Sequence, residues 1–381
     1  MSAPIHSHRP AGLVRALRRA AAPSVRLAPS FPWISPKTVP NPRPSQRRPR
    51  HLRDCAADRS SLSSCFRKVR TMTPTNPDSE LLRRFAPQAQ QLDWRWPGGR
   101  GLAISFVLNI EEGAELAIGA GDSINEAVHE VTHAIADVPD LCMQTHFEYG
   151  ARAGYARIAS RFIAHGLPLT LNVCGRALEH TPWVTADALA HDWELCGHGW
   201  RWESPAHMDE ATERATILRT MDSIGRHWGR RPTGWHCKSS ASLRTRTLLQ
   251  ELGFLYDSND YGGEVPCTMR RGDGSPYVIL PYAFDTNDMR FFGQGAFVQA
   301  DDFARYVIEA IEVLQEEARQ APRLLTIGLH TRILGRPARI RALDRILQHV
   351  QAQAQRQPAW VATREAMARH WLQLEQQRQT A

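Results

Sequence analysis

The stretch LAISFVLNIEEG, residues 102–113, is an almost unbroken series of apolar, β-favouring residues that ends in Glu111, Glu112 and a glycine. A nearly continuous apolar strand is typical of a parallel sheet that is covered on both faces. In barrels of parallel strands, catalytic side chains lie where the strands end. The stretch therefore predicts a buried strand that brings two carboxylates to a site. Taken alone, it also fits two glutamates that simply open a solvated loop.

Several other apolar segments of the chain end in polar or ionisable side chains in the same way. These segments are LPLTLNVCG (167–175) with Asn172, WELCGHGWRW (193–202) with His198, PTGWHCKSS (232–240) with Lys238, FLYDSND (254–260) with Asp257 and Asp260, YVILPYAFDTNDMRF (277–291) with Asp285, Asn287 and Asp288, and LLTIGLHTR (324–332) with His330 and Arg332. Amphipathic helical patterns lie between them, at residues 155–165, 208–228, 245–252, 301–319 and 339–353. The alternation predicts an α/β barrel with an active site at one end.

The charge of the chain is concentrated in its first part. Residues 1–71 carry a net charge of +13, whereas the whole chain carries +8, so residues 72–381 have a net charge of about −5. The first part is rich in Pro, Ser and Arg and has no apolar periodicity, which predicts a disordered tail ahead of one folded domain at 72–381. Its composition fits an organellar transit peptide, but we favour a reading frame opened too far upstream, with the true start at Met72.

Composition also limits the compartment and the partners. The seven cysteines are an odd number without a C-x-x-C pair, which indicates reduced core residues in a cytoplasmic protein. No stretch approaches the roughly 20 apolar residues of a membrane helix. The charge of residues 72–381 and the lack of such a stretch predict neither a nucleic-acid nor a membrane partner. We also expect a small-molecule substrate and a homo-oligomeric state. Lys238 is the only lysine within residues 72–381, and either chance or a need for a compact ammonium group explains it.

The order of the motifs resembles a known superfamily. LNIEEG, ELCGHGWRW, RPTGW, LPYAFDTNDMRF and TIGLHTRILGRPAR follow one another as in NodB-type polysaccharide deacetylases, and the resemblance spans about residues 85–372. HFEYGARAG, GFLYDS, DTNDMRF and GLHTRILGRPARI make the chain most similar to the cofactor-independent, PuuE-type allantoinase branch. The resemblance implies a distorted (β/α)7 barrel and the hydrolysis of a carbon–nitrogen bond other than a peptide bond.

Key positions depart from the usual deacetylase pattern, in which two aspartates and two histidines supply a base and a metal site. Glu111 and Glu112 match the aspartates and His198 matches the first histidine, but Trp202 occupies the position of the second. A catalytic zinc normally needs three protein ligands. Because only Glu112 and His198 remain, we expect no metal. The alternative is a zinc site in which His330 or Asp285 supplies the third ligand.

Without a metal, a carboxylate must activate water and the protein must stabilise the oxyanion. We expect Glu111 to be the general base, because burial and repulsion within the Glu111–Glu112 pair should raise one pKa of the pair. His330, or else His198, would protonate the leaving nitrogen, and Lys238, His198 and backbone N–H groups would face the oxyanion. The remaining residues that we expect to contact the substrate are Glu112, Trp202, Trp235, Asp285, Asn287, Asp288 and Arg332.

The best-supported function is an allantoinase-like hydrolysis of a cyclic ureide or amide. The alternatives are a metal-dependent N-deacetylase of acetylated sugars and a barrel that has lost catalysis but binds a small ligand. His129, Glu130 and His133 also spell the H-E-x-x-H pattern of zinc proteases. We interpret this pattern as a coincidence, because it lies in the insertion after the first strand. The segments YGGEVPCTM (261–269) and WHCKSS (235–240) differ from the allantoinase branch and leave the substrate open.

Overall fold

The computed structural model describes residues 94–380 except for 129, 131–134, 293–295 and 354–358. The tail predicted at 1–71 and the start predicted at Met72 lie outside these residues. Within the described part, no helix is both long and apolar enough to span a membrane.

The strands of the described residues form one nine-stranded, mixed sheet in the order β6-β7-β5-β4-β3-β2-β1-β8, with β9 paired to β1. All neighbours are parallel except β6 and β7, which form an antiparallel pair. The strands are β1 (Leu102–Ile110), β2 (Thr170–Val173), β3 (Glu194–Gly197), β4 (Gly234–Trp235), β5 (Tyr256–Asp257), β6 (Cys267–Arg270), β7 (Pro276–Ile279), β8 (Arg323–His330) and β9 (Trp360–Val361). The sheet curls strongly into a half-barrel, which confirms the predicted distorted α/β barrel.

Backbone contacts join the two sides of the curled sheet. The N–H of Gly328 in β8 donates to the carbonyl of Thr286, which follows β7, at 3.1 Å. The N–H of Leu324 donates to the carbonyl of Glu264, which precedes β6, at 2.7 Å. These bonds bring the segment after β7 beside β8, so Asn287 and His330 reach the same end of the barrel.

The central strand β1 is buried along its whole length, as its apolar sequence predicts. Its register pairs Asn109 with Asn172 of β2 on one side and with His330 of β8 on the other. Parallel strands in this register end at the same edge of the sheet. The residues that follow β1 and β3, together with His330 at the end of β8, therefore come together.

The five predicted helices are present, with ends that differ by at most two residues from those expected. They are α3 (Tyr155–His165), α6 (Glu210–Trp228), α7 (Thr245–Glu251), α8 (Ala300–Glu317) and α10 (Ile340–Gln353). The other helices are α2 (Leu141–Tyr149), α4 (Gly175–His180), α5 (Pro182–Ala190), α9 (Thr331–Leu334) and α11 (Arg364–Thr380), a π-helical turn η3 (Gly150–Gly154), and 3₁₀ turns η1 (Pro97–Gly99), η2 (Ile118–Ala120), η4 (Pro205–His207) and η5 (Asp288–Phe291).

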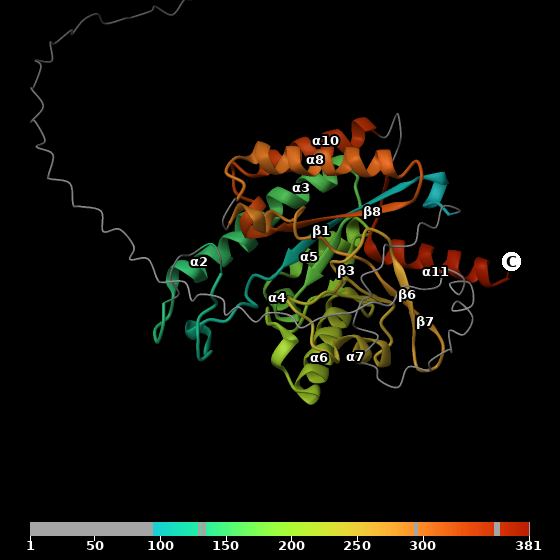
Figure 1. The fold of residues 1–381 in the computed structure, drawn as a ribbon. Helices are drawn as coiled ribbons and strands as arrows, with labels where there is room; N and C mark the ends of the chain where they lie inside the picture. The colour runs from blue at the N-terminus through green and yellow to red at the C-terminus, as the bar shows by residue number, and fades with distance from the viewer. Residues whose placement is uncertain (1–93, 129, 131–134, 293–295, 354–358, 381) are drawn as a thin grey trace, which may run out of the picture. The chain divides into compact units, whose positions relative to one another are not determined.

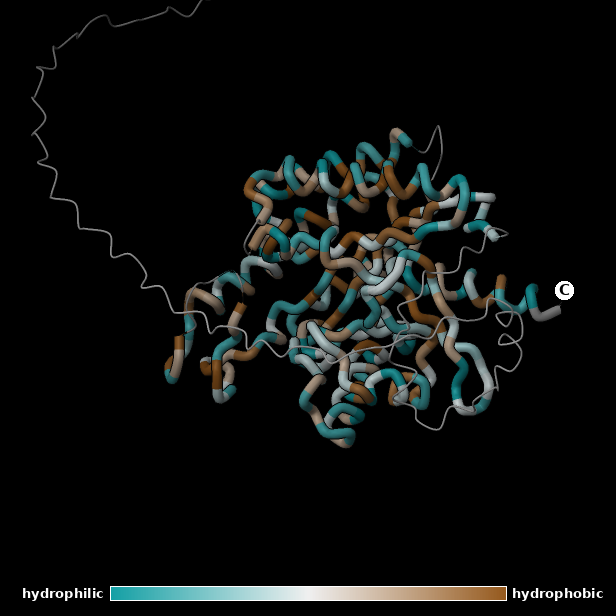
Figure 2. Tube along the Cα trace, viewed as in Figure 1, coloured by the Kyte–Doolittle hydropathy of each residue, from teal (hydrophilic) through white to brown (hydrophobic). Residues whose placement is uncertain are grey.

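The helices cover the sheet in two groups. The helices α3, α8 and α10 pack together beside β1 and β8, whereas α4, α6 and α7 lie together on the side of β3 (Figure 1). Figure 2 shows apolar and polar residues alternating along α8 and α10, as expected of helices with one buried face. The helices do not cover the carboxyl ends of the strands. The loops at these ends build the site.

Candidate active site

A cavity of about 820 Å³ opens at the carboxyl ends of the parallel strands. Glu111 follows β1, His198 follows β3, Lys238 follows β4 and His330 ends β8. Of the residues predicted from the sequence, the cavity wall includes Glu111, His198, Trp202, Lys238, Asp285, Asn287 and His330. The structure thus brings together residues that are more than 200 positions apart in the chain.

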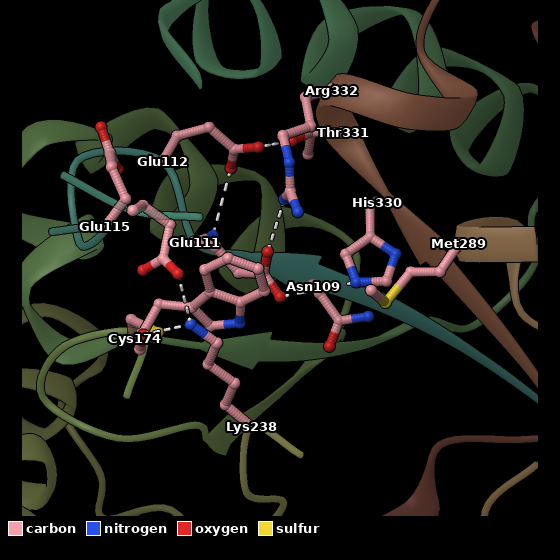
Figure 3. Close-up of polar contacts among 12 residues, drawn as sticks. Asn109, Glu111, Glu112, Glu115, Cys174, Lys238, Met289, His330, Thr331 and Arg332 are labelled. Carbon is pink, nitrogen blue, oxygen red and sulfur yellow. Dashed lines mark hydrogen bonds and ion pairs between the residues drawn. The ribbon is translucent and has the colours of Figure 1, made fainter. Parts of the chain in front are cut away.

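The carboxylate of Glu111 lies between the side chains of Arg332 and His330, as Figure 3 shows. Its Oε1 atom is 3.5 Å from Nε2 of His198 and 3.5 Å from Nε2 of His330. Its Oε2 atom accepts a hydrogen bond from the guanidinium of Arg332. Burial alone would raise the pKa of Glu111, but the positive charges of Arg332 and His330 hold this pKa well below its usual value. Glu111 is therefore an anion at neutral pH.

His330 is fixed between two carboxylates. Asp288 accepts a hydrogen bond from Nδ1 of the His330 ring at 2.7 Å and another from the backbone N–H of His330 at 2.7 Å. Burial would lower the pKa of His330, but the charges of Glu111 and Asp288 raise it to about 10. The ring is therefore an imidazolium at neutral pH, with its Nε2 proton directed toward Glu111 and the cavity.

His198 has a defined tautomer. Its Nδ1 atom lies 2.6 Å from the carbonyl oxygen of His236, so Nδ1 carries a proton and donates it to this carbonyl. In the neutral ring, Nε2 is then an acceptor that faces Oε1 of Glu111. Two acceptors that face each other at 3.5 Å are suited to share the protons of one water molecule.

Arg332 does not reach the cavity, in contrast to the substrate contact expected from the sequence. Its side chain is fully buried and bonds Glu111 on one side and Glu130, at 2.8 Å, on the other. The rings of Phe147 and Trp202 lie 4.6 and 4.9 Å from the guanidinium. Arg332 therefore acts on the site through Glu111.

Glu112 also lies outside the cavity wall, behind Glu111. It accepts hydrogen bonds from the hydroxyl of Thr331 and from the backbone N–H of Glu111. Burial raises the pKa of Glu112, although Arg332 and Thr331 oppose the rise. The expected rise within the glutamate pair thus falls on Glu112, and not on the glutamate that lines the cavity.

The glycines of the HFEYGARAG motif allow this packing around Glu112. A Cβ atom at Gly150 would collide with the Glu112 carboxylate and with the Thr331 hydroxyl. A Cβ atom at Gly154 would collide with the backbone of Thr331. The π-helical turn η3 therefore needs both glycines to lie against the end of β8.

Two further expected contacts are also corrected. Trp235 packs in a hydrophobic cluster with Phe254, Ile217 and Leu248, and the next residue of the chain, His236, lines the cavity instead. Asp288 is fully buried behind His330, so it positions that ring and does not border the cavity. Asp285 does line the cavity and also accepts a 3.3 Å hydrogen bond from Tyr306.

Lys238 is held by the insertion that follows β1. Its ammonium donates to Glu126 at 2.9 Å and to the carbonyl of Trp202 at 3.0 Å. It also lies 3.7 Å from the centre of the Trp202 ring. An ammonium has three protons, so one remains that can be directed into the cavity.

The H-E-x-x-H pattern falls partly outside the described residues, which exclude His129 and His133. The glutamate of this pattern, Glu130, contacts Arg332 and lies 3.4 Å from His146. Burial opposes ionisation, but His146 and Arg332 lower the pKa of Glu130 to about 2. This glutamate therefore fixes the guanidinium that in turn fixes Glu111.

The donors present do not suit a divalent cation of the deacetylase type. The glutamate that matches the metal-binding aspartate, Glu112, faces Thr331 and not the cavity. The ring of Trp202 stands at the position of the second histidine, between the cations of Lys238 and Arg332. Within the described residues, no group of three His, Cys, Asp or Glu side chains has the geometry of a metal site.

The chain is similar to several known proteins. Residues 136–256 match the family model described as polysaccharide deacetylase. A "putative polysaccharide deacetylase" of Schizosaccharomyces pombe is 32% identical over 297 residues, which are 72% of this chain and 92% of the relative. The solved structure of PuuE allantoinase is 39% identical, with a TM-score of 0.68, and covers 72% of this chain and 92% of its own. A probable polysaccharide deacetylase from Pseudomonas aeruginosa PAO1 is 38% identical, with the same TM-score of 0.68 and the same coverage.

Proposed function

The chain belongs to the polysaccharide deacetylase family, whose members hydrolyse carbon–nitrogen bonds, and we propose that it opens a cyclic ureide or amide without a bound metal. The observation that carries the proposal is the position of the Glu111 carboxylate, 3.5 Å from both His198 and His330, with Arg332 on its other oxygen. This arrangement places a water-binding anion and a protonated acid in one cavity, with a buried counter-charge behind the anion.

The nucleophilic water donates one proton to Oε1 of Glu111 and the other to Nε2 of His198. As its oxygen attacks the carbonyl carbon of the substrate, Glu111 accepts a proton and a tetrahedral intermediate forms. The Arg332 guanidinium keeps Glu111 ionised before this step, so the base is available at neutral pH. Positioned proton transfer of this kind typically accelerates a reaction by about 10²–10⁴-fold.

His330 supplies the proton that the leaving nitrogen needs. Its imidazolium, which has a pKa of about 10, donates from Nε2 while the carbon–nitrogen bond breaks. The neutral His330 ring then accepts the proton that Glu111 took from water. This transfer is direct because Nε2 of His330 lies 3.5 Å from Oε1 of Glu111. The cycle consumes one water, breaks one carbon–nitrogen bond and restores the ionisation state of both residues.

The negative charge that develops on the carbonyl oxygen is stabilised by a fixed cation. Lys238 lines the cavity with one ammonium proton beyond its bonds to Glu126 and Trp202. A preorganised donor of this kind contributes mainly in the transition state. The ammonium thereby takes the electrostatic role that a metal ion has in other hydrolases of this type.

The test is a substrate panel for the purified full chain. Hydantoin, allantoin and dihydrouracil are compared with N-acetylglucosamine oligomers, and ring-opened acids or released acetate are measured. We expect ring opening of at least one cyclic ureide and no release of acetate. Release of acetate from the sugars alone would show that the chain is a deacetylase. Binding of ureides without turnover would show a barrel that has lost catalysis.

A further inference from the structure

One wall of the cavity is a continuous series of aromatic rings that begins at the catalytic residues. The rings of His198 and His236 are parallel, with centroids 5.4 Å apart and an interplanar angle of 4°. The ring of Tyr282 also stacks on His236, with ring centroids 4.3 Å apart. Since His198 contacts Glu111, a substrate at the reaction centre lies at the start of this wall.

The series continues to the cavity mouth. The ring of Tyr261 meets Tyr282 edge to face at 5.9 Å and stacks on Phe284 at 4.0 Å with an interplanar angle of 1°. Phe284 is 64% exposed, although it is a large apolar side chain that lines the cavity. Exposed apolar surface in a concave site commonly marks a ligand contact.

His236 and Tyr261 in this wall carry no charge at neutral pH. Burial, together with the positive charge of Arg364, holds the pKa of His236 well below its usual value, so the ring stays neutral. Burial and nearby groups raise the pKa of Tyr261 to about 12, so its hydroxyl stays protonated. Met289 and Phe292 add further apolar surface to the cavity. These side chains give the cavity an apolar surface suited to an uncharged group, beside the charged Asp285 and Arg290 that also line it.

The cavity is also large for an unsubstituted ureide. Its volume of about 820 Å³ lies in the upper part of the range of about 300–1,000 Å³ for pockets that hold drug-sized ligands. The reaction centre at Glu111 occupies one end of it. A small polar ring placed at this end would leave the exposed surface of Phe284 without a ligand contact.

We propose that the substrate is a hydantoin or related cyclic ureide with an aromatic substituent, and that Tyr261 and Phe284 at the cavity mouth select for this substituent. The inference rests on the proposed function and specifies its substrate class. Water adds across one ring carbon–nitrogen bond as described above, and the product is the ring-opened ureido acid that keeps the aromatic group.

Kinetics of the full chain test the selectivity. We compare hydantoin with 5-benzylhydantoin and expect kcat/KM for the benzyl compound to be about 10–100-fold higher, the gain from burying one phenyl group. Phe284→Ala should lower the ratio of the two kcat/KM values by about fivefold or more. Trp183→Ala is the matched control, because Trp183 is a 45% exposed aromatic residue that is not part of the cavity wall. This control should leave the ratio unchanged.

Calorimetry separates this inference from the proposed function. The binding of both hydantoins and of N-acetylglucosamine oligomers is measured with Glu111→Gln, in which turnover is expected to be low. Tighter binding of 5-benzylhydantoin, lost in the additional Phe284→Ala change, supports the aromatic substituent even if no ureide is hydrolysed. Equal turnover and equal binding of both hydantoins would overturn the inference while leaving ureide hydrolysis intact. Tighter binding of the sugars through Phe284 would also overturn it.

Discussion

Arg332 holds one carboxylate oxygen of Glu111 from a fully buried position, while the other oxygen faces His198 and His330. The guanidinium itself is fixed by Glu130. The cation therefore determines both the orientation and the ionisation of the proposed base, although it does not touch the cavity. This relationship makes Arg332 a positioning residue whose role can be tested separately from that of Glu111.

Replacement of Arg332 by Met should reduce activity and change its pH dependence. The pKa of Glu111 is depressed in the folded protein, so the stability that its ionisation contributes is present above the unfolded pKa and is lost as pH falls through the folded pKa. Without the guanidinium, the folded pKa rises, and the acid limb of the kcat/KM profile should move to higher pH. A merely structural role would lower stability but leave that limb in place.

The loss of Arg332 should also destabilise the fold. Removing one partner of a buried ion pair typically costs about 3–5 kcal/mol, because a buried charge stays behind. Arg332→Lys keeps the charge and should retain part of both the stability and the pH profile. Denaturant unfolding of the two variants measures the difference. Equal stability of Arg332→Met and the unchanged protein would contradict this account of the ion pair.

Asp288→Asn tests the acid. The pKa of His330 is raised to about 10, so the stability from its charged form is complete below the unfolded pKa near 6.5 and is lost as pH rises through about 10. Because Asp288 contributes to this rise, its neutralisation should move the alkaline limb of the activity profile to lower pH. An alkaline limb that does not move would assign the acid to another group.

Glu111→Gln and His330→Ala test the proton cycle directly. Each should lower kcat by roughly 10²–10⁴ with little effect on the fold. The double variant should lose less than the product of the two single effects, since both residues act in one proton-transfer sequence. Steady-state kinetics with circular dichroism as the folding control gives the answer. Near-normal turnover of Glu111→Gln would exclude Glu111 as the base.

Gly154→Ala should destabilise the protein by about 1–3 kcal/mol, because the added methyl group would collide with the backbone of Thr331. Gly225→Ala is the matched control. Gly225 lies within α6, and a Cβ atom there would meet nothing within 4 Å. This control should be neutral or stabilise by about 0.5–1 kcal/mol. Equal thermal stability of the two variants would show that the collision at Gly154 is relieved at no cost.

The strand ends could be predicted from the sequence because apolar runs and their polar ends are local signals. The face of the strand on which each of these side chains lies could not be predicted. Side chains alternate between the two faces of a strand, so one position decides whether a residue meets the cavity or the core. Glu111 and His236 border the cavity, whereas the neighbouring Glu112 and Trp235 do not. Arg332 turns into the interior because α9 begins directly after β8.

Other parts of the site depend on contacts between distant segments. Glu126 and Glu130 lie in the insertion after β1 and reach Lys238 and Arg332, which no spacing along the chain indicates. The aromatic wall joins the loops after β3, β4, β5 and β7, and His198 is the one member of this wall that the sequence predicted as a site residue. The antiparallel strand β6 was not expected, because its four residues, CTMR, are too short a segment to indicate a strand.

The most direct test of the central claim is turnover after complete removal of metal. The full chain is dialysed against a strong chelator, its metal content is determined by mass spectrometry, and ureide ring opening is measured with and without added zinc or cobalt. The account predicts that the metal-depleted protein keeps its full activity, because Glu111, His330 and Lys238 provide the base, the acid and the cation. Loss of turnover on depletion, with recovery on addition of zinc or cobalt, would contradict it.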